Sequence, residues 1–356
     1  MKRTGILILL CFFSLSLCAN ESKEEKFNSG ELILEHLADE HSWHILTYRN
    51  SVGEEHDVAI PLPIIVINEG RLDVFMSNQF EHGQVAYKGY RLAGKEDGED
   101  LKGKILSVTT GQPVWDFSIT KNVAGILIIA GLIIFIFFKA KNIAQKRQGL
   151  EPKGMQTIVE YLLGFICNDI AIPSIGKERY AKYVPYLTTA FLFIFLCNLF
   201  GLMPFFPGGT NITGNIAVTL VLALFTFVIT QYSTNKHFWK HVFNMPGVPW
   251  WLKFPLPIMP LVEIIGLFTK PFALTVRLFA NITAGHVILL SFMCILFLVG
   301  EQNVVLGYGM SFLPVLFSVF MMAIEVLVAF IQAYVFALLS AIYFGMAKEE
   351  EHLSVE

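Results

Sequence analysis

Two long apolar segments near the C-terminus constrain the fold of this 356-residue chain more than any other feature. From Pro255 to Val299 the sequence has almost no polar break, and from Met310 to Met346 it has none. As helices these segments would be about 65 Å and about 55 Å long, whereas the hydrocarbon core of a bilayer is about 30 Å thick. Ordinary helix tilts do not absorb a twofold excess. Each segment is therefore either two helices in series or one helix lying steeply inclined in the membrane.

The composition is that of a membrane protein. Hydrophobic residues make up 54% of the chain and charged residues 15%, whereas soluble domains carry roughly 25% charged residues. The net charge of −3, without a basic arm or an aromatic-basic groove, gives no support to nucleic-acid binding. We expect no metal and no cofactor, because the five cysteines show neither a disulfide framework nor a metal-ligand spacing. These cysteines are Cys11, Cys18, Cys167, Cys197 and Cys294.

Residues 1–19 have the pattern of a secretory signal peptide. A basic start precedes a short apolar run, Gly5 to Leu17, and Ala19 is the candidate cleavage point. The run is too short for a comfortable membrane span. The alternative is a lipoprotein signal ending at Cys18, which the preceding leucine fits poorly.

Residues 20–115 form a separate region of mixed, polar composition. Short apolar runs, such as Val58 to Ile67 and Ile105 to Thr109, lie between clusters of Gly, Pro and acidic residues. This pattern is typical of strands and turns, so we expect a small extracytoplasmic N-terminal module of β character. Its histidines have loose spacing and no cysteine partners, which favours surface histidines over a metal site. They are His36, His41, His44 and His56.

The remaining chain, residues 116–356, is predicted to be an all-α polytopic membrane domain with spans at about 121–139, 183–203, 214–232, 256–299 and 309–346. Basic residues follow the first span, and the positive-inside rule therefore places that loop in the cytoplasm. The N-terminal module would then lie outside and the C-terminus inside. Apolar positions recur at helical spacing over residues 155–166. They predict an amphipathic helix on the cytoplasmic interface, with a packed helix of the soluble type as the alternative.

Arg277 lies in the middle of the apolar stretch KPFALTVRLFANITAGHVILL, Lys270 to Leu290. Arginine stays protonated in proteins, and a charge at mid-membrane costs at least about 2.5–3.5 kcal/mol, so it marks a functional site. On a helix Asn281 lies one turn further along on nearly the same face. His286 lies on roughly the opposite face, about 13.5 Å along the axis, and Glu263 lies on the Arg277 stripe in the other direction. The fixed positive charge of Arg277 thus has one titratable group, His286, some turns away in one direction and another, Glu263, some turns away in the other.

The stretch RLFANITAGH around Arg277 resembles the core motif of subunit a of the rotary F-type ATP synthase. The stretch IEVLVAFIQAYVFALLSAIYF, Ile324 to Phe344, resembles the same family, and NLFGLMP and NIAVTL are weaker matches. Together they cover most of the chain from about Asp116 onward. Within NLFGLMP, Gly201 stands where some bacterial members carry an acidic residue, which leaves that relay position in doubt. Asn215 would replace it only weakly.

The resemblance implies a fold, partners and a location. The two long segments would form a hairpin of strongly tilted helices packed against a rotor ring. The partners would be the ring of c subunits, the b subunits of the peripheral stalk and the lipid bilayer. The location would be the bacterial cytoplasmic (inner) membrane.

The resemblance also implies roles for individual residues. Arg277 would face the essential carboxylate of the ring, keep it ionised and block a direct proton leak between two half-channels. His286 and Glu325 resemble the proton-uptake pair, with the two residue types exchanged relative to many bacterial members. Glu263 would serve the release half-channel. The alternatives are a structural ion pair between His286 and Glu325, and an ion pair between Glu263 and Lys270.

An antiparallel register of the two long segments is consistent with these roles. It brings Gln332 near Arg277 and Glu325 near His286, and the seven-residue spacing of Glu325 and Gln332 puts both on one helix face. Asn281 would lie near the ring contact or line the channel. Simple packing between helices is an equal alternative for its amide.

The predicted function is a non-catalytic stator subunit that forms two proton half-channels and drives ring rotation coupled to ATP synthesis. The chain contains no P-loop, so we expect no nucleotide site. A proton- or sodium-coupled secondary transporter is the alternative, but the two halves show no internal repeat. An intramembrane hydrolase is disfavoured because HExxH and GxSxG motifs are both missing from the sequence.

Overall fold

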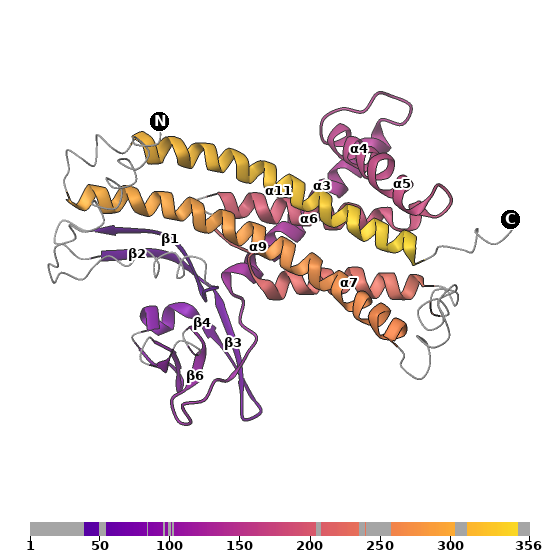
Figure 1. Ribbon diagram of the computed structural model, residues 1–356. Helices are drawn as coiled ribbons and strands as arrows, with labels where there is room; N and C mark the ends of the chain where they lie inside the picture. The colour runs from indigo at the N-terminus through magenta and orange to yellow at the C-terminus, as the bar shows by residue number, and fades with distance from the viewer. Residues whose placement is uncertain are drawn as a thin grey trace, which may run out of the picture.

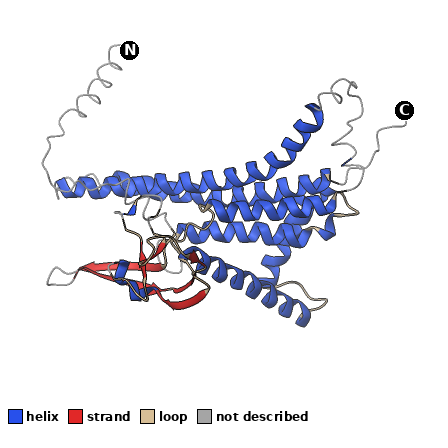
Figure 2. Cartoon of the chain, turned by 90° about the horizontal axis from the view of Figure 1, so that it is seen from below, coloured by secondary structure: helices blue, strands red, loops and turns tan. Residues whose placement is uncertain are grey.

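The computed structural model describes residues 39–49, 55–83, 85–94, 97–98, 101, 103–203, 208–234, 239, 258–302 and 312–347. Figure 1 shows two parts, a group of short strands and a bundle of long helices. In Figure 2 the strands are grouped alongside one end of the helical bundle. The predicted signal peptide, its alternative at Cys18, and His36 all lie outside the described residues.

Short antiparallel strands form three small sheets in the N-terminal region, which confirms its predicted β character. The first sheet pairs β1 (Ser42–Arg49) with β2 (Glu55–Pro61). In the second, β3 (Pro63–Asn68) lies between β4 (Arg71–Met76) and β7 (Trp115–Asp116). The third pairs β5 (Tyr90–Leu92) with β6 (Ile105–Ser107), and a 3₁₀ helix, η1 (Ser77–Gly83), follows β4.

The core of these sheets is small and rich in aromatic rings. Ile64 and Val66 alternate on the buried face of β3, as expected for a strand with one side covered. They pack with Phe75, Phe80 and Tyr90. The Phe75 and Phe80 rings meet edge to face with their centroids 5.3 Å apart, a favourable geometry for aromatic pairs. The region is thus held by interlocking large side chains.

In the described part of the chain, six helices are long and apolar enough to cross a membrane. Four are α3 (Lys121–Lys146), α6 (Val184–Leu202), α7 (Ile216–Ser233) and α9 (Ile258–Gln302). The others are α11 (Phe312–Met346) and a stretch made of α4 (Met155–Phe165), the π-helix η3 (Ile166–Ala171) and α5 (Ile172–Ile175). A short 3₁₀ helix, η4 (Tyr180–Lys182), precedes α6.

The two long apolar segments are single continuous helices. α9 has 45 residues and α11 has 35, which correspond to about 68 Å and about 52 Å at the usual helical rise. Pro271 lies inside α9 without ending it. Of the two arrangements that the sequence allowed, helices in series are therefore wrong for both segments, and their steep inclination in a membrane stays a prediction.

α9 and α11 pack against each other and run antiparallel, as predicted (Figure 1). Near one end of the pair, Phe292 stacks on Phe317 with ring centroids 5.7 Å apart. Toward the other end, the Lys270 ammonium lies 5.6 Å from the centre of the Tyr343 ring. From one contact to the next, the residue number on α9 falls while the residue number on α11 rises, as in an antiparallel hairpin.

Small residues let α11 pack closely against α6. A stripe of alanines at four-residue spacing is buried along α11: Ala329, Ala333, Ala337 and Ala341. Lipid tails are as apolar as leucine, so membrane helices associate chiefly through close contact, which small residues permit. The opposite face of α11 exposes large apolar side chains, including Phe320 and Leu327.

The sixth candidate span differs from the sequence-based expectation. Residues 155–166 were expected to form an amphipathic interfacial helix, but the helical stretch continues through η3 and α5 to Ile175. Its end packs tightly against α11, because a β-carbon on Gly345 would overlap the carbonyl of Ser174. Length and composition allow the stretch to span a membrane, and its position at the interface stays a prediction.

Candidate functional site

A cavity of about 320 Å³ lies where α6, α9 and α11 meet. Its polar lining consists of Asn198 from α6, Asn281 and His286 from α9, and Glu325 and Gln332 from α11. The structure therefore brings four of the predicted site residues to one place, and Asn198 joins them. A cavity of this size with several polar groups can hold water.

Glu325 is the most deeply buried ionisable group of the cavity. Its exposed fraction is 6%, and among the described residues neither carboxyl oxygen has a hydrogen-bond partner. On the facing helix, α9, the residue opposite the carboxyl group is Gly285, where a β-carbon would lie 2.7 Å from Oε1 of Glu325. A larger residue at 285 would require the carboxyl group to shift from this position. A buried oxygen without a protein donor is normally bonded to water.

His286 fits against a second glycine. A β-carbon on Gly201 of α6 would lie 3.2 Å from Nε2 of His286. A larger side chain at position 201 would therefore compete with the imidazole for the same space. His286 and Glu325 line one cavity, but the carboxyl oxygens accept no hydrogen bond from the imidazole. The two residues thus share a cavity without a hydrogen bond between them.

Arg277 lies outside this cavity, on an exposed part of α9. Its neighbours Phe272 and Val276 are apolar and also exposed. The guanidinium lies close enough to the Tyr343 hydroxyl to interact with it electrostatically. Within the described part of the chain no hydrogen bond joins Arg277 to Gln332, which lines the cavity instead. The two residues therefore do not form the direct contact that the register suggested.

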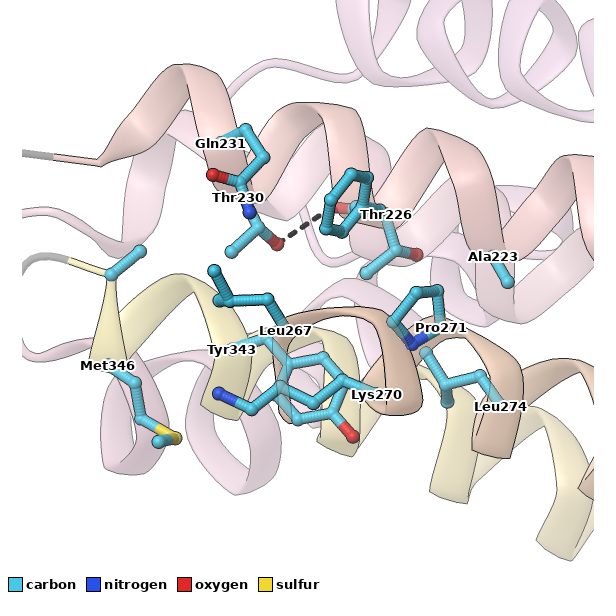
Figure 3. Close-up of a pocket in the computed structure, with 12 residues that line it drawn as sticks. Ala223, Thr226, Thr230, Gln231, Leu267, Lys270, Pro271, Leu274, Tyr343 and Met346 are labelled. Carbon is cyan, nitrogen blue, oxygen red and sulfur yellow. Dashed lines mark hydrogen bonds between the residues drawn. The ribbon is translucent and has the colours of Figure 1, made fainter. Parts of the chain in front are cut away.

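A second, much smaller cavity of about 20 Å³ lies toward the other end of the hairpin (Figure 3). Lys270, Tyr343 and Gln231 line it, and Thr230 donates a hydrogen bond of 2.7 Å to the carbonyl of Thr226 on the same wall. This volume is enough for about one water molecule. A water-sized space with a few polar groups in a mostly apolar lining thus lies between α7, α9 and α11.

Glu263, predicted to serve the release side, lies near the start of α9 and is half-buried. It does not line either of the two cavities. Its alternative role, an ion pair with Lys270, is wrong for the described structure, because the ammonium of Lys270 lies over the Tyr343 ring. That Glu263 serves the release half-channel stays a prediction.

Two polar groups of the site were missed in the sequence. Asn198 lines the large cavity and accepts a hydrogen bond of 2.6 Å from the Thr213 hydroxyl. Thr210 and Thr213, in the connection between α6 and α7, are both fully buried. The signal available was the spacing of Asn198 and Gly201, which puts both on one face of α6.

Comparisons with known proteins divide the chain at the start of α3. Residues 124–345 match the family described as ATP synthase A chain. Residues 32–122 match a domain of unknown function, DUF8433. The second match covers the region of short strands.

Curated relatives match the membrane part of the chain. ATP synthase subunit a 2 of Chlorobaculum tepidum is 44% identical over 241 residues, which are 65% of this chain and 64% of that protein. ATP synthase subunit a of Chloroherpeton thalassium is 42% identical over 243 residues, 67% of this chain and 68% of that protein. The chain thus spans about two thirds of the length of these relatives. ATP synthase subunit a of Anaeromyxobacter sp. is 38% identical over 248 residues, 67% of this chain and 57% of that protein.

The family match covers more than half of the chain, and the helices that it covers carry the cavity and Arg277. The relatives add sequence identities of 44% and 42% over about two thirds of this chain. This multi-pass membrane chain therefore belongs to the ATP synthase subunit a family and carries an additional N-terminal domain.

Proposed function

We propose that this chain is the stator subunit in the membrane sector of a rotary ATP synthase and that it provides two proton half-channels separated by Arg277. One observation carries the proposal. A cavity of about 320 Å³ with a titratable lining lies on the same pair of long apolar helices as an exposed arginine. The chain would hold no nucleotide site of its own.

The uptake half-channel begins at the large cavity. His286 and Glu325 each bind and release a proton, and water in a cavity of about 320 Å³ would connect them. Asn281 lines the cavity and is itself exposed on α9. It therefore lies at the point where a proton would leave the cavity for a neighbouring subunit.

Arg277 separates uptake from release. Its charge is fixed, and it lies on an apolar outer surface of α9. A carboxyl group on a rotor must be protonated to cross lipid, because an unpaired charge in hydrocarbon is costly. Within about 4–6 Å of the guanidinium the same group would favour its ionised form. A passing carboxyl would therefore release one proton on one side of Arg277 and take up another on the other side.

The release half-channel would use the small cavity and Glu263. Lys270, Tyr343 and Gln231 offer polar atoms for one water molecule, and Glu263 lies two turns nearer the start of α9. The proposed partners are a ring of c subunits facing Arg277, the b subunits of the peripheral stalk and the lipid bilayer. The proposed location is a bacterial inner membrane, with the N-terminal domain outside and the C-terminus in the cytoplasm.

The proposal is tested by replacing Arg277 in the intact synthase. Arg277→Ala should reduce proton-driven ATP synthesis in inverted membrane vesicles to background. Arg277→Lys should also be poor, because lysine loses its proton readily in a low-dielectric site. Lys177→Ala is the matched control, since it removes a cation that is exposed in the connection between α5 and α6. Normal synthesis by Arg277→Ala, with the subunit retained in the complex, would refute the central role.

A further inference from the structure

The N-terminal domain contains a larger cavity that no part of the proposed function uses. Its volume is about 500 Å³, and its lining includes Asp39, Glu40 and His41. His41 is paired with Asp116, with 2.8 Å between Nε2 and Oδ2. This cavity lies where the strands meet the first turn of α3, because the backbone amide of Lys121 donates to the carbonyl of Glu40.

Asp39 connects the lining of this cavity to α3. It accepts hydrogen bonds from the hydroxyl of Thr120, at 2.9 Å, and from the backbone amide of Asn122, at 3.2 Å. The Asn122 side chain is 3% exposed, and within the described residues its Oδ1 atom has no partner. Lys121 is buried, which disfavours its charged form. The negative charges of Glu40 and Asp39 offset part of this effect.

One turn further along α3, Gly125 makes close contact with the buried segment between α6 and α7. A β-carbon on Gly125 would lie 3.1 Å from Oγ1 of Thr210. Thr210 has no exposed surface, and its hydroxyl also lacks a partner in the described structure. Oδ1 of the adjacent Asn211 is buried and unpartnered in the same way.

Thr210 in turn lies beside His286. A β-carbon on Gly201 would lie 3.3 Å from the carbonyl oxygen of Thr210 and 3.2 Å from Nε2 of His286. A second connection runs through Thr213, which donates to Asn198 of the large membrane cavity. The contacts are therefore continuous from the cavity in the N-terminal domain to the proposed uptake site.

Three buried oxygens without partners among the described residues lie along this connection, on Asn122, Thr210 and Asn211. Buried polar atoms are nearly always hydrogen-bonded, and where the protein offers no partner the bond is made with ordered water. The row of unsatisfied oxygens therefore indicates water between the two cavities. Water in contact with hydroxyl and amide groups forms the hydrogen-bonded chain that a moving proton needs.

We propose that the N-terminal domain forms the outer vestibule of the proton-uptake path and that water held by Asn122, Thr210 and Asn211 carries protons from it to His286. The inference rests on the proposed function, because it takes His286 as the uptake site. The acidic lining would give the domain a direct role in proton uptake. A cleft lined with negative charge raises the local concentration of cations, protons included. Asp39, Glu40 and Asp116 supply negative charge there, and His41 and Lys121 offset part of it.

The test removes the water-binding oxygens without changing the size of the side chains much. Asn122→Leu and Thr210→Val should each slow passive proton conduction through the membrane sector, stripped of its catalytic head, by about tenfold or more, a modest loss for a proton-transfer group. Thr188→Val is the matched control. It removes a hydroxyl that is equally buried and unpartnered, but at the opposite end of α6 from Gly201. Conduction in the control should change less than about twofold.

A second measurement does not depend on activity. In a chain with its native cysteines replaced by alanine, Thr210→Cys should react with Ag⁺ added from the outer side of the membrane. The reaction is read as protection of the thiol from later alkylation after denaturation. A thiol that stays unreactive in the assembled complex would overturn the water path even if the conduction variants fail to assemble.

His286→Ala in the same conduction assay separates the two proposals. If His286→Ala blocks conduction while Asn122→Leu and Thr210→Val conduct normally, the vestibule is refuted and the proposed function stands. If His286→Ala conducts normally, the proposed uptake site is refuted. Equal slowing by Thr188→Val would show that buried hydroxyls act through packing, and this too would overturn the vestibule.

Discussion

The helical hairpin and the N-terminal domain are built in opposite ways. In the domain, large rings such as Phe75 and Tyr90 interlock, and charged groups are paired, as in the two hydrogen bonds from Arg91 to Asp97. In the hairpin the closest packing uses alanine, and Glu325 is left without a partner among the described residues. A water-exposed region is stabilised by burying large apolar groups, whereas a membrane region must gain its stability from close contact. The membrane part can therefore leave its ionisable groups available for chemistry.

The largest expected effect on function concerns His286 and Glu325, the two titratable groups that line one cavity. The single changes His286→Glu and Glu325→His put two like groups in one cavity and should slow passive proton conduction by about a hundredfold. The double exchange restores one group of each kind and should recover much of the rate. Conduction is measured in the stripped membrane sector over a pH range of about 6 to 9, around the ordinary pKa of histidine.

The double variant decides whether the two residues act together. If its loss in free energy equals the sum of the two single losses, His286 and Glu325 act independently. The shared cavity would then have no functional meaning, although the antiparallel packing of α9 and α11 would be unaffected.

The next effect concerns the aromatic core of the N-terminal domain. Phe75→Ala should lower the domain's free energy of unfolding by about 3–5 kcal/mol, because it removes a ring that packs against Phe80, Tyr87 and Tyr90. Hydrogen exchange followed by mass spectrometry should show faster exchange in the strands of the domain and unchanged exchange in α11. Phe117→Ala, at an exposed ring, is the control. Equal acceleration in α11 would mean that the two regions unfold as one unit.

A smaller effect is expected from overpacking the hairpin. Ala337→Leu adds bulk to a position with no exposed surface and should destabilise the bundle by about 1–3 kcal/mol. Thermal unfolding of the detergent-solubilised chain measures this change. Leu327→Ala removes apolar atoms from the exposed face of α11. It should lower the stability of the bundle less than Ala337→Leu does. A larger loss from Leu327→Ala would contradict the idea that close contact of small residues holds α11 to α6.

The smallest effect concerns the ion pair of the domain. Burial by itself would raise the pKa of Asp116, but hydrogen bonds from His41 and Ser118 outweigh it and lower the pKa. The stabilisation is therefore fully present above the unfolded pKa of about 3.9 and is lost as the pH falls through the lower folded value. The difference in unfolding free energy between the parent chain and Asp116→Asn should be less than about 1 kcal/mol and should shrink below about pH 4.

Denaturant unfolding followed by the fluorescence of Trp115, which is largely exposed, measures this difference. Glu69→Gln at an exposed turn is the control. A difference that grows on acidification would mean that Asp116 is destabilised in the folded domain.

The large features of the fold could be predicted because they depend on local pattern. The lengths of α9 and α11 follow from uninterrupted apolar sequence, and their antiparallel pairing follows from the positions of Glu325 and Gln332 on one face. The strands of the N-terminal region follow from alternating apolar runs between turn residues. These signals lie within segments of a few to a few tens of residues.

The rest depends on contacts between segments far apart in sequence. Residues 210–213 are buried only because α3, α6 and α9 meet around them. Gly285 carries no functional group, so its role in making room for Glu325 could not be read from its residue type. The helical stretch that begins at Met155 continues to Ile175, beyond the predicted residues 155–166. The polar residues in it made the stretch look less apolar than a membrane span.

The fit of His286 against Gly201 has a consequence for how such a site can change by mutation. With 3.2 Å between a would-be β-carbon and Nε2 of His286, a side chain at 201 and the imidazole at 286 must give way to each other by a few tenths of an ångström. The effects of substitutions at the two positions are therefore coupled. A larger residue at 201 should be tolerated better when the residue at 286 is smaller than histidine. Deep mutational scanning of positions 201 and 286 together should show this dependence.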